Sequence, residues 1–158
     1  MQNLIKSTLE KDEINFQTLQ EDENGTAFRM GFGLKNGRVD VIIDINTAWH
    51  SYSILAIFPV TVEDNKIRRV SELLNRINYG LTLGDFEIDF SSGNLRFKTT
   101  QLYEEIHPDT EFLFRRKLQI SFETMDRFTP AIMSVIYANI LPEQALAQLQ
   151  NNIDPSMN

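Results

Sequence analysis

The stretch FRMGFGLKNGRVDVIIDI, residues 28–45, decides the fold of this chain. Its centre holds Asn36-Gly37, a dipeptide that favours two-residue hairpin turns because both turn positions need positive φ. Apolar and polar residues alternate on either side of it, as in two strands that bury one face. If Lys35 and Arg38 flank the turn, the apolar residues of one face pair as follows: Leu34 with Val39, Phe32 with Val41, Met30 with Ile43 and Phe28 with Ile45.

The charged residues favour the same register, and a second hairpin repeats the pattern. In the first hairpin Arg29 then faces Asp44 on the polar side. A second turn at Ser92-Gly93 aligns two further alternating stretches, so that opposite charges again meet across the strands. A shift of one residue would turn every apolar side chain toward solvent. The predicted pairs of the second hairpin are Phe90 with Leu95, Ile88 with Phe97, Asp89 with Arg96 and Glu87 with Lys98.

The whole pattern predicts a single α+β domain over residues 1–151, with a mainly antiparallel five-stranded sheet and helices packed on it. The expected element order is α-β-β-β-α-β-β-α, followed by a short final helix that starts at Pro142. Residues 152–158 are expected to form a disordered tail. The other predicted elements are a helix within 1–13, strands at 26–35, 38–46 and 51–60, a helix between 61 and 80, a hairpin within 85–100 and a helix over 109–138.

The segment 109–138 carries two conflicting signals. Its apolar residues recur at helical spacing, so we predict a helix, yet Leu118, Ile120 and Phe122 alone would also fit a strand. Pro130 removes a backbone donor, so the helix should kink or break near Phe128.

Composition limits the class of function. The net charge of −7 opposes a phosphate backbone, so we expect no nucleic-acid partner. The chain has no cysteine, which removes thiol chemistry and disulfides and fits a cytoplasmic protein. It shows neither a signal peptide nor a stretch apolar enough to cross a membrane, so we expect no membrane association. No cofactor motif is present either.

Carboxylates on the strands are the main candidates for catalysis. Asp85, Glu87 and Asp89 alternate along one strand, so one sheet face carries all three, and they could bind a metal or act in acid–base chemistry. Arg96 and Lys98 lie opposite in the predicted register, which favours structural ion pairs instead. A metal-dependent hydrolase or a small-ligand sensor is therefore the alternative function, and a non-enzymatic interaction domain is the main prediction.

The outer face of the sheet is the candidate interaction surface. Two glycines within one strand indicate close approach by another backbone, because glycine otherwise weakens a strand. The surface could bind a protein partner or a second copy of the chain, or it could be covered by the protein's own first or last helix. The candidate residues are Arg29, Gly31, Gly33, Asp40, Ile42, Leu55 and Ile57, with Trp49 as an anchor at the rim.

Four short stretches resemble the bacterial YbjN family. The resemblance implies a fold like that of type III secretion chaperones, which dimerise and hold partner polypeptides, and a role in sensory transduction. It implies no catalytic residues, so none is assigned here. The stretches that carry the resemblance are LLNRIN at 73–78, LGDFEID at 83–89, GNLRF at 93–97 and DRFTPAI at 126–132.

Overall fold

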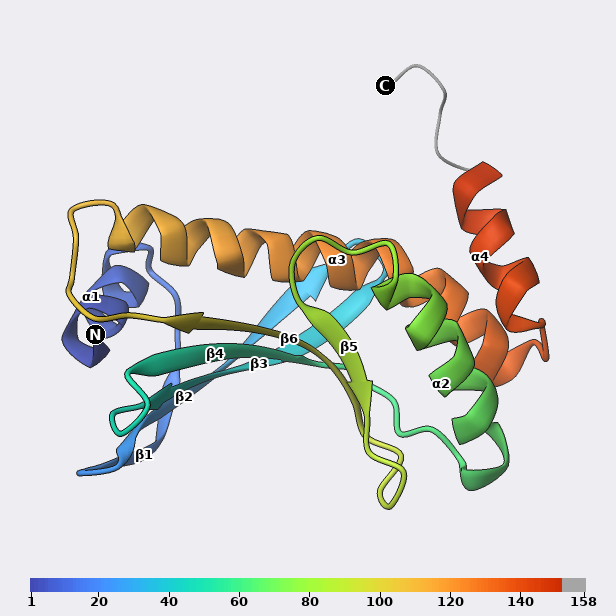
Figure 1. Ribbon diagram of the computed structural model, residues 1–158, viewed down its shortest axis with the longest axis horizontal. Coiled ribbons are helices and arrows are strands. Elements are labelled where there is room, and N and C mark those ends of the chain that lie inside the picture. Colours follow the sequence, from blue (N-terminus) through green and yellow to red (C-terminus); the bar gives the residue numbers. More distant parts are fainter. Residues whose placement is uncertain (152–158) are drawn as a thin grey trace.

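The computed structural model describes residues 1–151, and the tail expected at 152–158 lies outside the described residues. The described chain is an α+β structure in which helices and one sheet form separate layers (Figure 1). Its elements are α1 (Gln2–Lys11), β1 (Gln17–Asp22), β2 (Gly25–Leu34), β3 (Gly37–Asn46), β4 (Ser51–Ile57), α2 (Asp64–Asn78), β5 (Asp85–Ile88), β6 (Leu95–Leu102), α3 (Thr110–Tyr137) and α4 (Pro142–Asn151).

The sheet has six antiparallel strands in the order β1-β2-β3-β4-β6-β5, so the prediction of five strands was wrong by one. The missed strand is β1, whose sequence QTLQED is exposed at every position. It lacks apolar alternation because it lies at the sheet edge. Its pairing with β2 also shifts between Thr18 and Gln20.

The register of the first hairpin differs from the prediction by two residues. Lys35 and Asn36 form the turn, and Gly37 already pairs with Leu34. Gly37 has a φ of 152°, which side chains disfavour, so the glycine is needed beside the turn and not within it. A shift of two keeps every residue on its predicted face.

The second hairpin is also shifted by two residues. Phe86 pairs with Phe97 and Glu87 with Arg96, so Asp89 does not face Arg96. Instead the Asp89 carboxylate accepts hydrogen bonds from the backbone N–H of Ser91 and the hydroxyl of Ser92. These hydrogen bonds stabilise the loop between β5 and β6, so Asp89 and Phe90 belong to the loop and do not pair across the strands.

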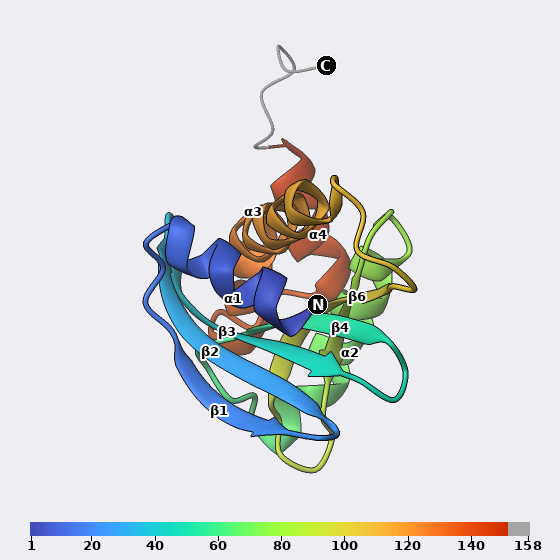
Figure 2. The same cartoon turned by 90° about the vertical axis from the view of Figure 1, so that its left-hand side faces the viewer.

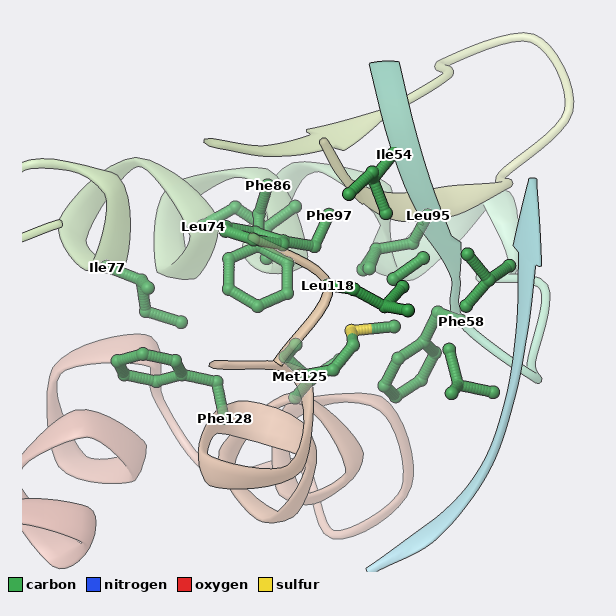
Figure 3. Packing of buried hydrophobic residues seen from close by; sticks show 14 of the residues in the cluster. Ile54, Phe58, Leu74, Ile77, Phe86, Leu95, Phe97, Leu118, Met125 and Phe128 are labelled. Carbon is green, nitrogen blue, oxygen red and sulfur yellow. The ribbon is translucent and has the colours of Figure 1, made fainter. Parts of the chain in front are cut away.

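The inner face of the sheet and the helices enclose the apolar core. Phe86 contacts the Phe97 ring beside it on the sheet and the Phe128 ring of α3, with centroids 5.0 and 5.9 Å apart (Figure 3). Met125 and Leu118 of α3 are buried in the same cluster. Leu118 is therefore a buried helical residue, and the strand alternative for 118–122 is wrong.

Helix α3 continues through Pro130, so the predicted break near Phe128 is absent. Proline has no N–H to donate to the carbonyl of Asp126 four residues earlier. The side-chain amide of Asn36, in the β2–β3 turn, donates to that carbonyl at 3.1 Å instead. The backbone N–H of Asn36 also donates to the Asp126 carboxylate at 2.7 Å. A turn distant in sequence thus replaces the donor that proline lacks.

Asn78, the last residue of α2, covers the free edge of β5. Its side-chain amide donates to the carbonyl of Phe86 and accepts from the N–H of Phe86, at 2.9 and 2.8 Å. These are the two bonds that another strand would make. The edge is therefore protected against pairing with a further strand.

Candidate functional site

The outer face of the sheet presents a small apolar strip at its centre, formed by Ile42, Leu55 and Ile57. Ile42 on β3 pairs with Leu55 on β4, and Ile57 follows two residues after Leu55 on the same face. All three side chains are half-buried by their neighbours on the sheet. The alternation of the sequence predicted this strip, and the structure brings its three members together.

Ion pairs border the apolar strip on both sides. On the β2 side, Arg29 donates to Asp40 at 2.5 Å, so the predicted pair of Arg29 with Asp44 is wrong. On the β6 side, Arg96 pairs with Glu87 at 2.6 Å, and Lys98 lies 3.8 Å from the other oxygen of the same carboxylate. All these groups are substantially exposed, so each pair contributes little stability, at most about 1 kcal/mol.

The two glycines of β2 have different surroundings. A Cβ added to Gly31 would lie 2.9 Å from the Arg38 guanidinium, so that side chain already occupies the space beside Gly31. A Cβ on Gly33 would meet no atom within 4 Å. Open space therefore lies beside Gly33 and not beside Gly31.

Two shallow hollows meet at Ile57 on this face. One of about 430 Å³ is lined by Arg38, Asp40 and Ile57 together with Phe58 and Pro59. The other, about 680 Å³, lies between Ile57 and the β5–β6 hairpin. The apolar strip is thus flanked by concave surface at one end of the strands.

No described helix covers the outer face. In Figures 1 and 2, α1 and α3 lie on one side of the sheet, where their buried residues join the core. Helix α4 contacts α2 and α3. The alternative that the first or last helix covers the outer face is therefore wrong for residues 1–151.

Trp49 lies in the β3–β4 turn and is 77% exposed. Its backbone N–H is held by the side chain of Asn46. Asn46 is four residues beyond Ile42 on β3, or roughly 13 Å along the strand. Trp49 therefore lies at the end of the sheet and not beside the apolar strip.

Two of the three candidate catalytic carboxylates, Glu87 and Asp89, have structural partners, and Asp85 lies opposite Lys98 in the register of β5 and β6. Glu87 is neutralised by Arg96 and Lys98, and Asp40 by Arg29. Hydrogen bonds from Ser92 and Ser91 lower the pKa of Asp89 below its usual range, because they favour the charged carboxylate. Within residues 1–151 no three His, Asp or Glu side chains are grouped so that they could hold a metal ion.

A further hollow, which the sequence analysis missed, lies at the other end of the molecule. It has a volume of about 530 Å³ and forms where the start of α1, the end of β6 and the start of α3 meet (Figure 1). Tyr52 is one of the residues that line it. Tyr52 follows the apolar alternation of β4, so the sequence identifies it only as a core residue.

No protein-family model matches this chain, and no curated protein matches it. The resemblance to the YbjN family stays a prediction from the motifs. Across the described residues, no helix is both long and apolar enough to cross a bilayer.

Proposed function

We propose that this chain is a non-enzymatic protein-interaction domain that forms a homodimer through the outer face of its sheet. One observation carries the proposal: the strip of Ile42, Leu55 and Ile57 is open to solvent on the face without helices. Isolated exposed apolar residues are ordinary, but a contiguous strip with a charged border is typical of an interaction surface.

The charges of β3 support a second copy of the chain as the partner. In a two-fold dimer, every contact occurs twice. If a first residue of one copy contacts a second residue of the other copy, the second residue of the first copy also contacts the first residue of the other. Arg38 and Asp44 lie at opposite ends of the outer face of β3, and neither forms an ion pair with another described residue. Antiparallel stacking of two β3 strands would bring each Arg38 opposite Asp44 of the second copy.

The same arrangement matches two of the three strip residues to each other and sets Ile42 opposite Asp40 of the second copy. Val41, Ala56 and Phe97 form one row across the sheet. A two-fold axis along this row sets Leu55 against Ile57 of the second copy. Arg96 and Lys98 would then approach each other near the border, where Glu87 of each copy offsets their charge.

The size of the face predicts a reversible dimer. The paired region of β2, β3, β4 and β6 measures on the order of 20 Å by 23 Å, or ~450 Å² in projection. Stable complexes bury about 800 Å² on each partner, so the interface is small. We expect dissociation constants in the micromolar range, where assembly responds to protein concentration.

The resemblance to YbjN proteins adds a biological setting to the proposal. In that setting the chain would be a chaperone-like regulatory domain in bacterial sensory transduction or stress response, located in the cytoplasm, with a protein partner of unknown identity. The outer face of the sheet, or the hollow that Tyr52 lines, would bind that partner. No cofactor and no nucleic acid enter this proposal.

Light scattering coupled to size exclusion tests the proposed dimer. Leu55→Lys would place two charges at the centre of the interface and should weaken dimerisation by about tenfold or more. Phe90→Lys is the control, because Phe90 is also apolar and lies in the β5–β6 loop, where it is 59% exposed. Equal effects of the two variants, or a wild-type protein that stays monomeric at millimolar concentration, would contradict the proposal.

A further inference from the structure

The hollow at the β6–α3 end has an apolar floor and an acidic rim. Leu102 and Leu113 lie in its lining and remain 67% and 53% exposed, which is unusual for two leucines side by side in one concavity. Its lining residues are Met1, Tyr52, Gln101, Leu102, Tyr103, Glu104, Glu105, His107, Asp109, Thr110 and Leu113.

Tyr52 supplies a hydrogen-bonding group at the base of this hollow. Its side chain is only 2% exposed and packs edge-on against the Phe114 ring, with centroids 6.0 Å apart. No hydrogen bond joins its hydroxyl to another residue in the described part of the chain. A fully buried hydroxyl without a partner occurs among the described residues at Thr99 and not at Tyr52. The Tyr52 hydroxyl is therefore not fully buried, and this hollow is the concave surface that Tyr52 lines.

This hydroxyl is a donor at any physiological pH. Burial raises the pKa of Tyr52 to about 12, because the phenolate would lose its hydration. The hollow leaves this hydroxyl accessible to water, so an acceptor that entered the hollow would take the place of that water as its hydrogen-bond partner. An apolar hollow with one such donor is the usual composition of a binding site.

Tyr103, in the wall of the hollow, is held by contacts with His50 in the β3–β4 turn. The backbone N–H of Tyr103 donates to the carbonyl of His50 at 2.8 Å, and the two rings stack with centroids 5.9 Å apart. His50 has a φ of 46°, a left-handed conformation that histidine adopts more readily than most residues with a side chain. The hollow is therefore shaped before any ligand arrives.

The rim carries three carboxylates, and the lining also contains the nitrogen groups of Met1 and His107. Glu104, Glu105 and Asp109 line the hollow, and none of them has an ion pair or a side-chain hydrogen bond to another described residue. No lysine or arginine is present in the lining. An acidic rim by itself would be only a solvated surface, but here it surrounds an apolar floor and an unpaired donor.

We propose that this hollow binds a short extended peptide segment of a partner protein, in which an apolar side chain lies next to a basic one. A backbone carbonyl of the peptide accepts the Tyr52 hydroxyl proton. The apolar side chain packs on Leu102 and Leu113, and the basic side chain meets the rim carboxylates. This site lies apart from the strip on the outer face, so it can be occupied in monomer and dimer alike.

A nuclear magnetic resonance titration of the full chain tests the site. The probe is the peptide acetyl-Arg-Leu-Phe-Lys-amide, and acetyl-Glu-Leu-Phe-Glu-amide is the control of opposite charge. We expect the basic peptide to shift the amide resonances of residues 101–113 in a saturable way and to bind at least about fivefold more tightly than the acidic peptide. Equal affinities, or shifts located elsewhere, would overturn the proposal.

Two variants separate binding from folding. Tyr52→Phe should weaken the basic peptide about threefold and leave the melting temperature unchanged, because the hydroxyl has no partner in the free protein. The double variant Glu104→Gln with Glu105→Gln should weaken it about fivefold. The matched control, Glu10→Gln with Glu123→Gln, removes the same charge from exposed helix positions outside the hollow. A control that weakens the peptide as much as the rim variant would mean that only net charge matters, which contradicts a defined site.

Discussion

Replacing Pro130 by alanine is expected to stabilise this protein, although the proline lies inside its longest helix. Pro130 is exposed, so the substitution removes little packing. The alanine N–H can donate to the carbonyl of Asp126, which in the wild type receives the side-chain amide of Asn36 at 3.1 Å. The change therefore restores a helical hydrogen bond at small cost elsewhere.

The size of the effect follows from two opposing terms. Proline in a helix interior is about 3 kcal/mol less favourable than alanine. Proline also restricts the unfolded chain, which returns about 0.4–1 kcal/mol of stability to the wild type. The difference predicts a gain of roughly 2 kcal/mol in the free energy of unfolding for Pro130→Ala.

Asn36→Ala extends this prediction to a double-mutant cycle. In the wild type it should cost about 1 kcal/mol, because the Asp126 carbonyl would lose its donor. In the Pro130→Ala background it should cost less, since the helix then supplies that donor. Urea unfolding followed by circular dichroism measures all four proteins, and the dependence on urea should stay unchanged.

Glu123→Ala is the control, because Glu123 is an exposed position of the same helix, and its effect should stay within about 0.5 kcal/mol. The reasoning would be refuted if Pro130→Ala lowered the stability. It would also be refuted if Asn36→Ala had the same cost in both backgrounds. Either result would mean that the Asn36 amide does not replace the donor that proline lacks.

Three other predictions concern stability. Thr99→Val should raise the free energy of unfolding by about 1 kcal/mol in urea, because the Thr99 hydroxyl is buried without a partner; a loss would reveal a hidden hydrogen bond. Arg96→Glu should cost roughly 0.5 kcal/mol and be rescued by Glu87→Lys, and an absence of coupling would contradict the β5–β6 register. The hydrogen bond from Arg115 lowers the pKa of Asp12 below its ordinary value of 3.8. The pair therefore stabilises the fold fully at pH values above 3.8, and this stabilisation is lost as the pH falls through the lowered pKa. Arg115→Gln should therefore lose less stability than the wild type between about pH 5 and pH 2, and parallel pH profiles would disprove this.

In the two hairpins, the alternation of apolar and polar residues predicted the faces of the strands but not their register. Strand faces repeat every two residues, so apolar spacing predicted the inner and outer faces but could not distinguish two registers that differ by two. The turn residues determine which of the two registers forms. Gly37 takes its φ of 152° beside the first turn, and the Asp89 carboxylate accepts hydrogen bonds within the second loop. Ion pairs across strands were less decisive, since Glu87 reaches both Arg96 and Lys98.

Tertiary contacts explain what the sequence could not predict. Strand β1 is exposed at every position, so its sequence shows no apolar alternation from which a strand could be predicted. Helix α3 passes Pro130 because Asn36, 90 residues from Asp126, supplies a donor. The apolar strip on the outer face was predicted because alternation identifies it. The hollow near Tyr52 was not, since its lining comes from three distant parts of the chain.

A distance between two spin labels tests the proposed dimer most directly. The chain has no cysteine, so Gly33→Cys gives a single attachment site, and Gly33 lies on the outer face with open space around it. The proposed two-fold axis sets the two Gly33 positions about 20 Å apart along the strands and about 10 Å apart between sheets. Pulsed electron resonance should therefore give one intermolecular distance of roughly 20–35 Å, which disappears with Leu55→Lys. A label at Glu123→Cys on α3 that gives a short intermolecular distance, while the Gly33→Cys label gives none, would contradict dimerisation through the outer face of the sheet.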